Sequence, residues 1–147
     1  MKQFWNLMQT ENQLTGFILR LTLAIVIFPH GAQMAFGWFG GFGFSAAMNY
    51  LTQTENLPWL VSLLVILMQV LFPVMLVIGL ATRLVAIGLI GLFIGMVLTS
   101  HLDFGFFMNW LGTQKGEGFE YHLLAIGMGV SLFILGGGRY SIDRRLS

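Results

Sequence analysis

Apolar residues in this chain collect into long stretches that are separated by short polar or glycine-rich connections. Four such stretches stand out: residues 14–36, 57–80, 84–102 and 119–138. A helix crosses the roughly 30 Å hydrocarbon layer of a bilayer with about 20 apolar residues, and each stretch is close to that length. The pattern therefore predicts four transmembrane helices that form a single membrane domain over residues 1–147.

Lys and Arg residues are distributed unevenly among the connections. With four spans, both chain ends and the short connection at residues 81–83 lie on one side of the membrane. That side carries five cationic residues: Lys2, Arg83, Arg139, Arg144 and Arg145. The opposite side carries only Lys115, and cytoplasmic segments are enriched in Lys and Arg. We therefore expect an all-α fold, an up-down antiparallel four-helix transmembrane bundle with two long outer loops and both termini in the cytoplasm.

The composition excludes several classes of function. A mean hydropathy of +0.81 and a charged fraction of 9% are not those of an ordinary soluble domain. The chain has no cysteine, so disulfides, thiolate metal sites and cysteine redox chemistry are excluded. The net charge is only +1 and the cations form no stripe, which argues against nucleic acid as a partner. Any redox role therefore needs a bound cofactor or another subunit.

A row of small residues lies along one face of the third stretch. Gly88, Gly91 and Gly95 fall within about 60° of one another at 100° per residue. Small residues let helices approach closely in lipid, and Gly91 to Gly95 is a GxxxG spacing. We expect this face to pack within the bundle, and dimerisation through it is the alternative.

Both predicted outer loops are rich in aromatic residues. The first, residues 37–56, is expected to lie in the membrane interface as a half-buried loop and a short helix. The second, residues 103–118, is long enough to cap the bundle, and we expect it to do so.

Few polar side chains lie inside the predicted spans. Arg20 lies six residues into the first span; its guanidinium either reaches back to the cytoplasmic interface or forms a buried ion pair. Together with Pro29 and His30, it interrupts the first apolar run, which favours a retained helix over a cleaved signal peptide. Gln69 lies four residues before Pro73, which has no N–H to donate to its carbonyl. This polar notch either stabilises a kink through an interhelical hydrogen bond or binds a ligand.

The richest group of polar residues lies at the outer ends of the spans. Antiparallel helices bring His30, Gln33, His101, Glu120 and His122 to a similar depth. Such a group binds a polar head group, exchanges protons or holds a metal ion. Glu120 and His122 lie about 200° apart on their helix, so we predict that His30, Gln33, His101 and Glu120 form the ligand site. Metal binding by His30, His101 and His122 is a weaker hypothesis than this ligand site. Simple contact of these side chains with lipid head groups is the alternative to both.

Several short motifs occur in an order that resembles the DoxX family of bacterial membrane proteins. They are Leu19-Arg20-Leu21, His30-Gly31-Ala32-Gln33, Phe36-Gly37, Phe39-Gly40-Gly41, Gly79-Leu80-Ala81-Thr82-Arg83, His101, Gly105-Phe106-Phe107, Glu120 and Gly136-Gly137-Gly138-Arg139-Tyr140-Ser141-Ile142-Asp143. Two positions depart from the family pattern: Met34 stands where a lysine is frequent, and Gln69 stands where a glutamate is frequent. Both departures remove a charge from the membrane region.

The resemblance implies a four-span protein of the bacterial inner membrane that takes part in a redox or oxidative-stress system. Relatives include the small membrane subunit of a thiosulfate:quinone oxidoreductase, so a quinone-like or other lipid-soluble ligand is implied at the outer polar residues. Partners would be other membrane or periplasmic redox proteins, or a second copy of the chain. The sequence contains no independent catalytic constellation, so the chain is at most a membrane subunit of an oxidoreductase. The alternatives are a structural or assembly subunit and a metal-handling or transport protein.

Overall fold

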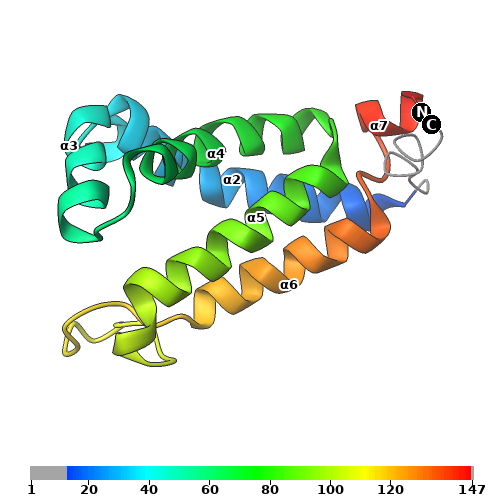
Figure 1. Ribbon diagram of the computed structural model, residues 1–147. Helices are drawn as coiled ribbons and strands as arrows, with labels where there is room; N and C mark the ends of the chain where they lie inside the picture. Colours follow the sequence, from blue (N-terminus) through cyan, green and yellow to red (C-terminus); the bar gives the residue numbers. More distant parts are fainter. Residues whose placement is uncertain (1–12, 147) are drawn as a thin grey trace.

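The chain folds into helices and connecting loops (Figure 1). The computed structural model describes residues 13–146, and this part of the chain contains no β-strand, as the predicted all-α fold requires. In order, the elements are α2 (Leu14–Phe36), the 3-10 turn η1 (Trp38–Gly40), α3 (Phe44–Asn49), the π-helical turn η2 (Tyr50–Thr54), α4 (Trp59–Ile78), α5 (Thr82–Met96), the π-helical turn η3 (Val97–His101), the 3-10 turn η4 (Leu102–Phe104), α6 (Glu120–Leu135) and α7 (Ile142–Leu146).

Within residues 13–146, three helical segments are long and apolar enough to cross a membrane: α2, α4 and the segment Thr82–Phe104, which continues α5 through η3 and η4. Helix α6 is also apolar, but its 16 residues span only about 24 Å at 1.5 Å per residue. Consecutive long helices run in opposite directions (Figure 1). We name the end of the bundle that carries α7 the inner end, and the opposite end the outer end.

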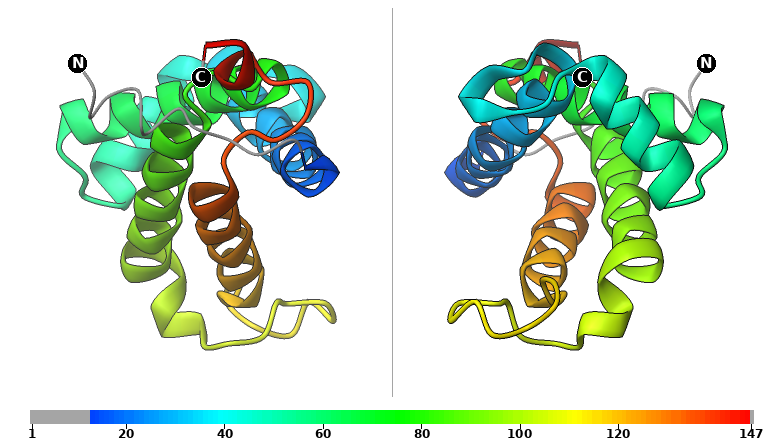
Figure 2. Two further views of the ribbon diagram at one scale, coloured as in Figure 1. Left: turned by 90° about the vertical axis from the view of Figure 1, so that its right-hand side faces the viewer. Right: turned by 90° about the vertical axis from the view of Figure 1, so that its left-hand side faces the viewer.

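The long helices are arranged as two pairs. Helix α2 packs along α4 and α5 packs along α6, while the two pairs diverge toward the outer end (Figures 1 and 2). The main apolar core draws on all four helices and includes Ile27 of α2, Leu76 of α4, Leu89 of α5 and Leu132 of α6. Many large apolar side chains on the outward faces are exposed, as expected of helices that face lipid.

Glycines allow the closest approaches between helices. A Cβ atom on Gly31 would lie 2.2 Å from the carbonyl oxygen of Gln69, so α2 contacts the backbone of α4 here. A Cβ atom on Gly88 would lie 2.4 Å from the ring of Phe72. Gly91 has no such neighbour within 4 Å, and neither does Gly95. The predicted packing of the glycine face within the chain is therefore found at Gly88 alone.

The segment after α6 crosses the inner end of the bundle and ties the two helix pairs together. The Asp143 carboxylate accepts hydrogen bonds from the backbone N–H groups of Ala81 and Thr82, at 2.6 and 2.8 Å, and so satisfies amides at the start of α5. The N–H of Asp143 itself donates to the Gly79 carbonyl at 3.0 Å. At the start of α2, the carbonyl of Gln13 accepts from the N–H of Arg139 at 2.9 Å.

The second outer loop does not cap the bundle. It runs sideways past the outer end of α6 instead of across the ends of α2 and α4 (Figure 2). Trp110 and Leu111 at its tip are 83% and 86% exposed. The expectation of a capping loop is therefore wrong, because this loop packs on itself and on α6.

Candidate functional site

Arg20 is fully buried near the inner end, with 0% of its surface exposed. Its guanidinium donates to five backbone carbonyl oxygens: Gly137 at 3.0 Å, Leu76 at 2.7 Å, Arg139 at 3.1 Å, Tyr140 at 2.8 Å and that of Val77. Two of these carbonyls belong to the last turn of α4, where the helix dipole is negative. The other three belong to the segment that follows α6.

Neither expectation for Arg20 describes this arrangement. The guanidinium does not reach out to the interface, since it is enclosed by protein. Among the residues that the structure describes, its hydrogen-bond acceptors are carbonyl oxygens and no carboxylate takes part. Asp143 interacts with it electrostatically but directs its oxygens to the start of α5. A planar group with five N–H donors suits a ring of carbonyls, so Arg20 joins α2, α4 and the segment after α6.

Gln69 lies in a tight contact between α2 and α4. Its side chain is 4% exposed, and its amide donates back to the Val65 carbonyl at 3.4 Å. Pro73 leaves the Gln69 carbonyl without its usual helical donor, and Gly31 packs directly against that oxygen. The side-chain amide of Gln69 is already hydrogen-bonded and its carbonyl is covered by Gly31. Gln69 therefore serves the packing of α2 against α4.

Two histidines whose rings are in contact lie at the outer end of α5 and α6. The rings of His101 and His122 are 4.2 Å apart between centroids, at an interplanar angle of 43°. His122 is 6% exposed and contacts the rings of Phe93 and Tyr121 at 5.8 and 5.6 Å. Its Nδ1 atom is buried and has no hydrogen-bond partner among the described residues. His101 is held by Nδ1, which lies 2.8 Å from the Glu117 carbonyl oxygen.

Glu120 begins α6 and binds the second outer loop. One of its carboxylate oxygens accepts a hydrogen bond from the N–H of Met108 at 2.9 Å and from the indole N–H of Trp110 at 3.2 Å. Its own N–H donates to the Phe106 carbonyl at 2.9 Å. The carboxylate therefore holds the loop in place.

The predicted residues of α2 lie on the other helix pair. His30 is exposed, and Gln33 donates to the Phe39 carbonyl at 3.2 Å, within its own turn of chain. Among residues 13–146, no hydrogen bond or ring contact connects either of them to His101 or Glu120. The structure thus brings together His101 and His122, and it places the remaining predicted residues elsewhere. His122, expected to matter less than Glu120, is the buried member of the pair.

Metal binding by the three histidines finds no support in this arrangement. Within the part of the chain that the structure describes, no three His, Cys, Asp or Glu side chains are grouped so that they could hold a metal ion.

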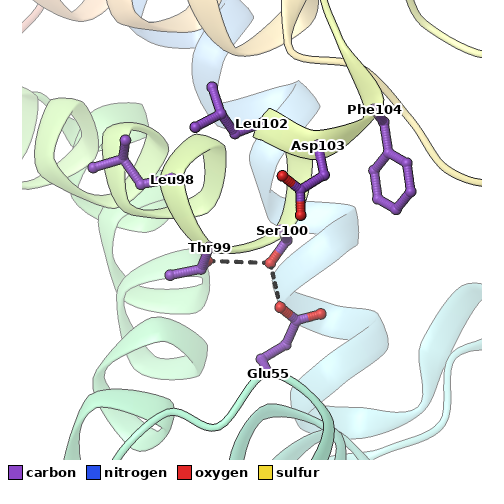
Figure 3. Close-up of a pocket in the computed structure, with 7 residues that line it drawn as sticks. All are labelled: Glu55, Leu98, Thr99, Ser100, Leu102, Asp103 and Phe104. Atoms are coloured by element: carbon purple, nitrogen blue, oxygen red, sulfur yellow. Dashed lines mark hydrogen bonds between the residues drawn. The ribbon is translucent and has the colours of Figure 1, made fainter.

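A small cavity of about 160 Å³ lies at the outer end, between the loop before α4 and the end of α5 (Figure 3). Glu55 accepts a hydrogen bond from the Ser100 hydroxyl at 2.6 Å, and the Tyr50 hydroxyl donates to its other oxygen. Asp103 lines the same cavity. Sequence reasoning missed these residues. An available signal was that Glu55 precedes one span and Asp103 follows the next, which places both at the same end of an antiparallel bundle.

The fold is that of a membrane protein with several apolar helices, as the exposed apolar faces and helix lengths require. The chain belongs to the DoxX family, whose family model matches residues 16–102, from the first turn of α2 to the end of η3 and the first residue of η4. Neither a curated protein nor a solved structure matches this chain. The match confirms the family resemblance seen in the motifs, and DoxX membership indicates a membrane protein of the redox- or stress-associated kind.

Proposed function

We propose that this DoxX protein is a component of a bacterial inner-membrane redox or oxidative-stress system that binds the head group of a quinone-like, lipid-soluble ligand. The proposed site is the His101–His122 pair at the outer end of α5 and α6. The observation that carries the proposal is the Nδ1 atom of His122, which is buried without a hydrogen-bond partner. A buried polar atom left unpaired costs about 1–3 kcal/mol, and a ligand that pairs with it recovers that energy.

The surroundings of His122 suit an aromatic carbonyl compound. An imidazole N–H can donate to a quinone carbonyl, and the rings of Phe93 and Tyr121 provide apolar aromatic surfaces next to it. His101 also contacts this site, with its ring 4.2 Å from that of His122 between centroids. The electron transfer belongs to the ligand and to a partner protein, since the chain supplies binding and orientation.

Ligand binding can be tested with the purified protein in lipid nanodiscs and a short-chain benzoquinone. We expect saturable binding that weakens about tenfold in His122→Phe, because one hydrogen bond of roughly 1.4 kcal/mol is lost while the ring remains. His30→Phe is the matched control, because His30 is exposed on α2, and it should bind as the wild type does. Absence of saturable binding by the wild-type protein, or equal weakening in both variants, would contradict the proposed site. A structural or assembly role would then describe the protein better.

A further inference from the structure

The loop between η4 and α6, residues 105–119, combines exposed apolar side chains with internal hydrogen bonds. Its tip presents two large apolar side chains, Trp110 at 83% and Leu111 at 86% exposure. Several of its backbone N–H groups, including those of Met108, Asn109 and Gln114, donate to side chains of the loop and of Glu120. Exposed apolar side chains next to N–H groups that are bonded within the protein are expected where a segment touches lipid, because lipid offers those N–H groups no water.

Side chains of the loop and of α6 provide much of the internal pairing. Glu117 accepts from the Asn109 N–H at 2.7 Å, and Asn109 exchanges hydrogen bonds with the backbone of Gln114 at 3.0 and 3.1 Å. Glu120 accepts from the Met108 N–H and from the indole of Trp110. The one polar atom of the Trp110 side chain is therefore already bonded, and the rest of the indole is free to contact lipid.

The length of α6 gives an independent reason to place this loop at the membrane surface. Its 16 residues cover about 24 Å, which is less than the roughly 30 Å of hydrocarbon. The segments that flank α6 must therefore lie at the edge of the membrane. On the inner side, Gly136, Gly137 and Gly138 are buried in protein. On the outer side, residues 105–119 occupy that depth, and they extend sideways beyond α6 (Figure 2).

We propose that residues 105–119 form a lipid-anchoring loop whose Trp110–Leu111 tip inserts into the bilayer interface at the outer end. Helix α6 also exposes large apolar side chains, including Leu124 at 71% exposure. Lys115 lies on the polar part of the loop and is exposed, which suits contact with water and phosphate groups. Trp is a preferred residue at this depth.

The absence of cysteine from the chain allows a direct test. A nitroxide spin label on Leu111→Cys, in nanodiscs, reports collisions with oxygen, which concentrates in lipid, and with a water-soluble nickel chelate. Leu124→Cys serves as the lipid reference and Lys115→Cys as the water reference. We expect the oxygen-to-nickel ratio at position 111 to match that at 124 and to exceed that at 115 several-fold. Leu111 is exposed, so its replacement leaves the core intact.

Two outcomes would overturn the proposal. A ratio at position 111 equal to that at 115 would place the tip in water. Low collision rates with both reagents would show that protein covers the tip, either a second copy of the chain or a partner. A second measurement uses Trp110 as the only tryptophan and lipids brominated near the head group. Quenching by these lipids supports insertion, and quenching by aqueous iodide alone contradicts it. Neither measurement depends on quinone binding.

Discussion

At the scale of single residues, the buried guanidinium of Arg20 is the strongest constraint in the molecule. A charge placed inside a membrane protein is tolerated only where polar groups replace its water. Here five carbonyl oxygens from two separate segments provide that replacement. The dependence is mutual, because these carbonyls lie in the last turn of α4 and in an irregular segment, where helical donors run out. The Leu76 carbonyl also accepts from the Gly79 N–H at 3.1 Å. Arg20 therefore acts as a connector of chain segments.

Arg20→Lys is expected to destabilise the protein strongly. An ammonium group has three donors and no planar fork, so at least two of the five carbonyls lose their partner. At about 1–3 kcal/mol for each buried group left unpaired, the loss is about 2 kcal/mol or more. Thermal unfolding in detergent or nanodiscs measures it. Arg139→Lys is the control, because this side chain is exposed and should change the midpoint little. Equal midpoints for Arg20→Lys and the wild type would mean that the cation reaches water instead.

Tyr50 should titrate abnormally in the outer loop. The hydrogen bond that its hydroxyl donates to Glu55, together with partial burial and the nearby carboxylate charge, raises the pKa of Tyr50 above its ordinary value of 10.0. The unfolded chain loses this proton first, so the folded state binds more protons in that range. The stabilisation is complete below about pH 10 and is lost as pH rises through the folded pKa.

Absorbance of the phenolate at alkaline pH tests this. The difference between wild type and Tyr50→Phe isolates one tyrosine of the three in the chain. We expect the titration midpoint of Tyr50 to lie above that of free tyrosine. In Glu55→Gln, which removes the carboxylate charge, the Tyr50 midpoint should lie closer to the free value. A midpoint unaffected by Glu55→Gln would show that Glu55 is not the cause.

At the scale of elements, glycines decide how closely the helices of each pair approach. Gly31 lets α2 contact the backbone of α4 at Gln69, and Gly88 makes room for Phe72 between α4 and α5. Gly91 and Gly95 lie on the same glycine-rich face of α5 as Gly88, but no atom lies within 4 Å of a Cβ added at either position. A glycine pattern therefore marks a face where close approach is allowed, and the actual partner depends on how the helices are rotated and tilted.

Three alanine substitutions separate these roles. Gly31→Ala should destabilise most, because its Cβ would lie 2.2 Å from backbone atoms that cannot move aside. Gly88→Ala should cost less, since the Phe72 ring can turn. Gly91→Ala should be neutral or stabilising by up to about 1 kcal/mol, because alanine favours helix over glycine. Unfolding midpoints rank the three. A clear loss of stability in Gly91→Ala would reveal an intermolecular contact at this face.

The elements themselves are readily predicted from the sequence, while the site is not. The first apolar stretch and α2 share the bounds 14–36, and α4 and α6 lie within their predicted stretches, because a long apolar run in lipid folds as a helix that satisfies its own backbone. The partners of Arg20 are backbone carbonyls, which carry no side-chain signature. The pairing of His101 with His122 depends on the rotation of α6 and on the π-helical turn at the end of α5, which shifts His101 from its position in a regular helix.

At the scale of the whole molecule, the two ends differ in both charge and construction. The inner end is held by Arg20 and Asp143, which tie the segment after α6 to α4 and to the start of α5. At the outer end, the hydrogen bond between Glu55 and Ser100 joins the two diverging helix pairs. The inner end is therefore tied by several hydrogen bonds between segments, while the proposed ligand and lipid contacts lie at the outer end, where the helix pairs diverge (Figures 1 and 2).

Membrane orientation is the prediction that belongs to this scale. The structure places the start of α5 and α7 at the inner end, and α3 and the 105–119 loop at the outer end (Figure 1). Reporter fusions after Arg83 and at the C-terminus should therefore agree with each other, as should fusions near Asn49 and Thr113. The excess of cations at the inner end assigns the first pair to the cytoplasm and the second to the outside. Disagreement within a pair would contradict the fold. Consistent inversion of both pairs would contradict only the assignment of sides, leaving the arrangement of helices intact.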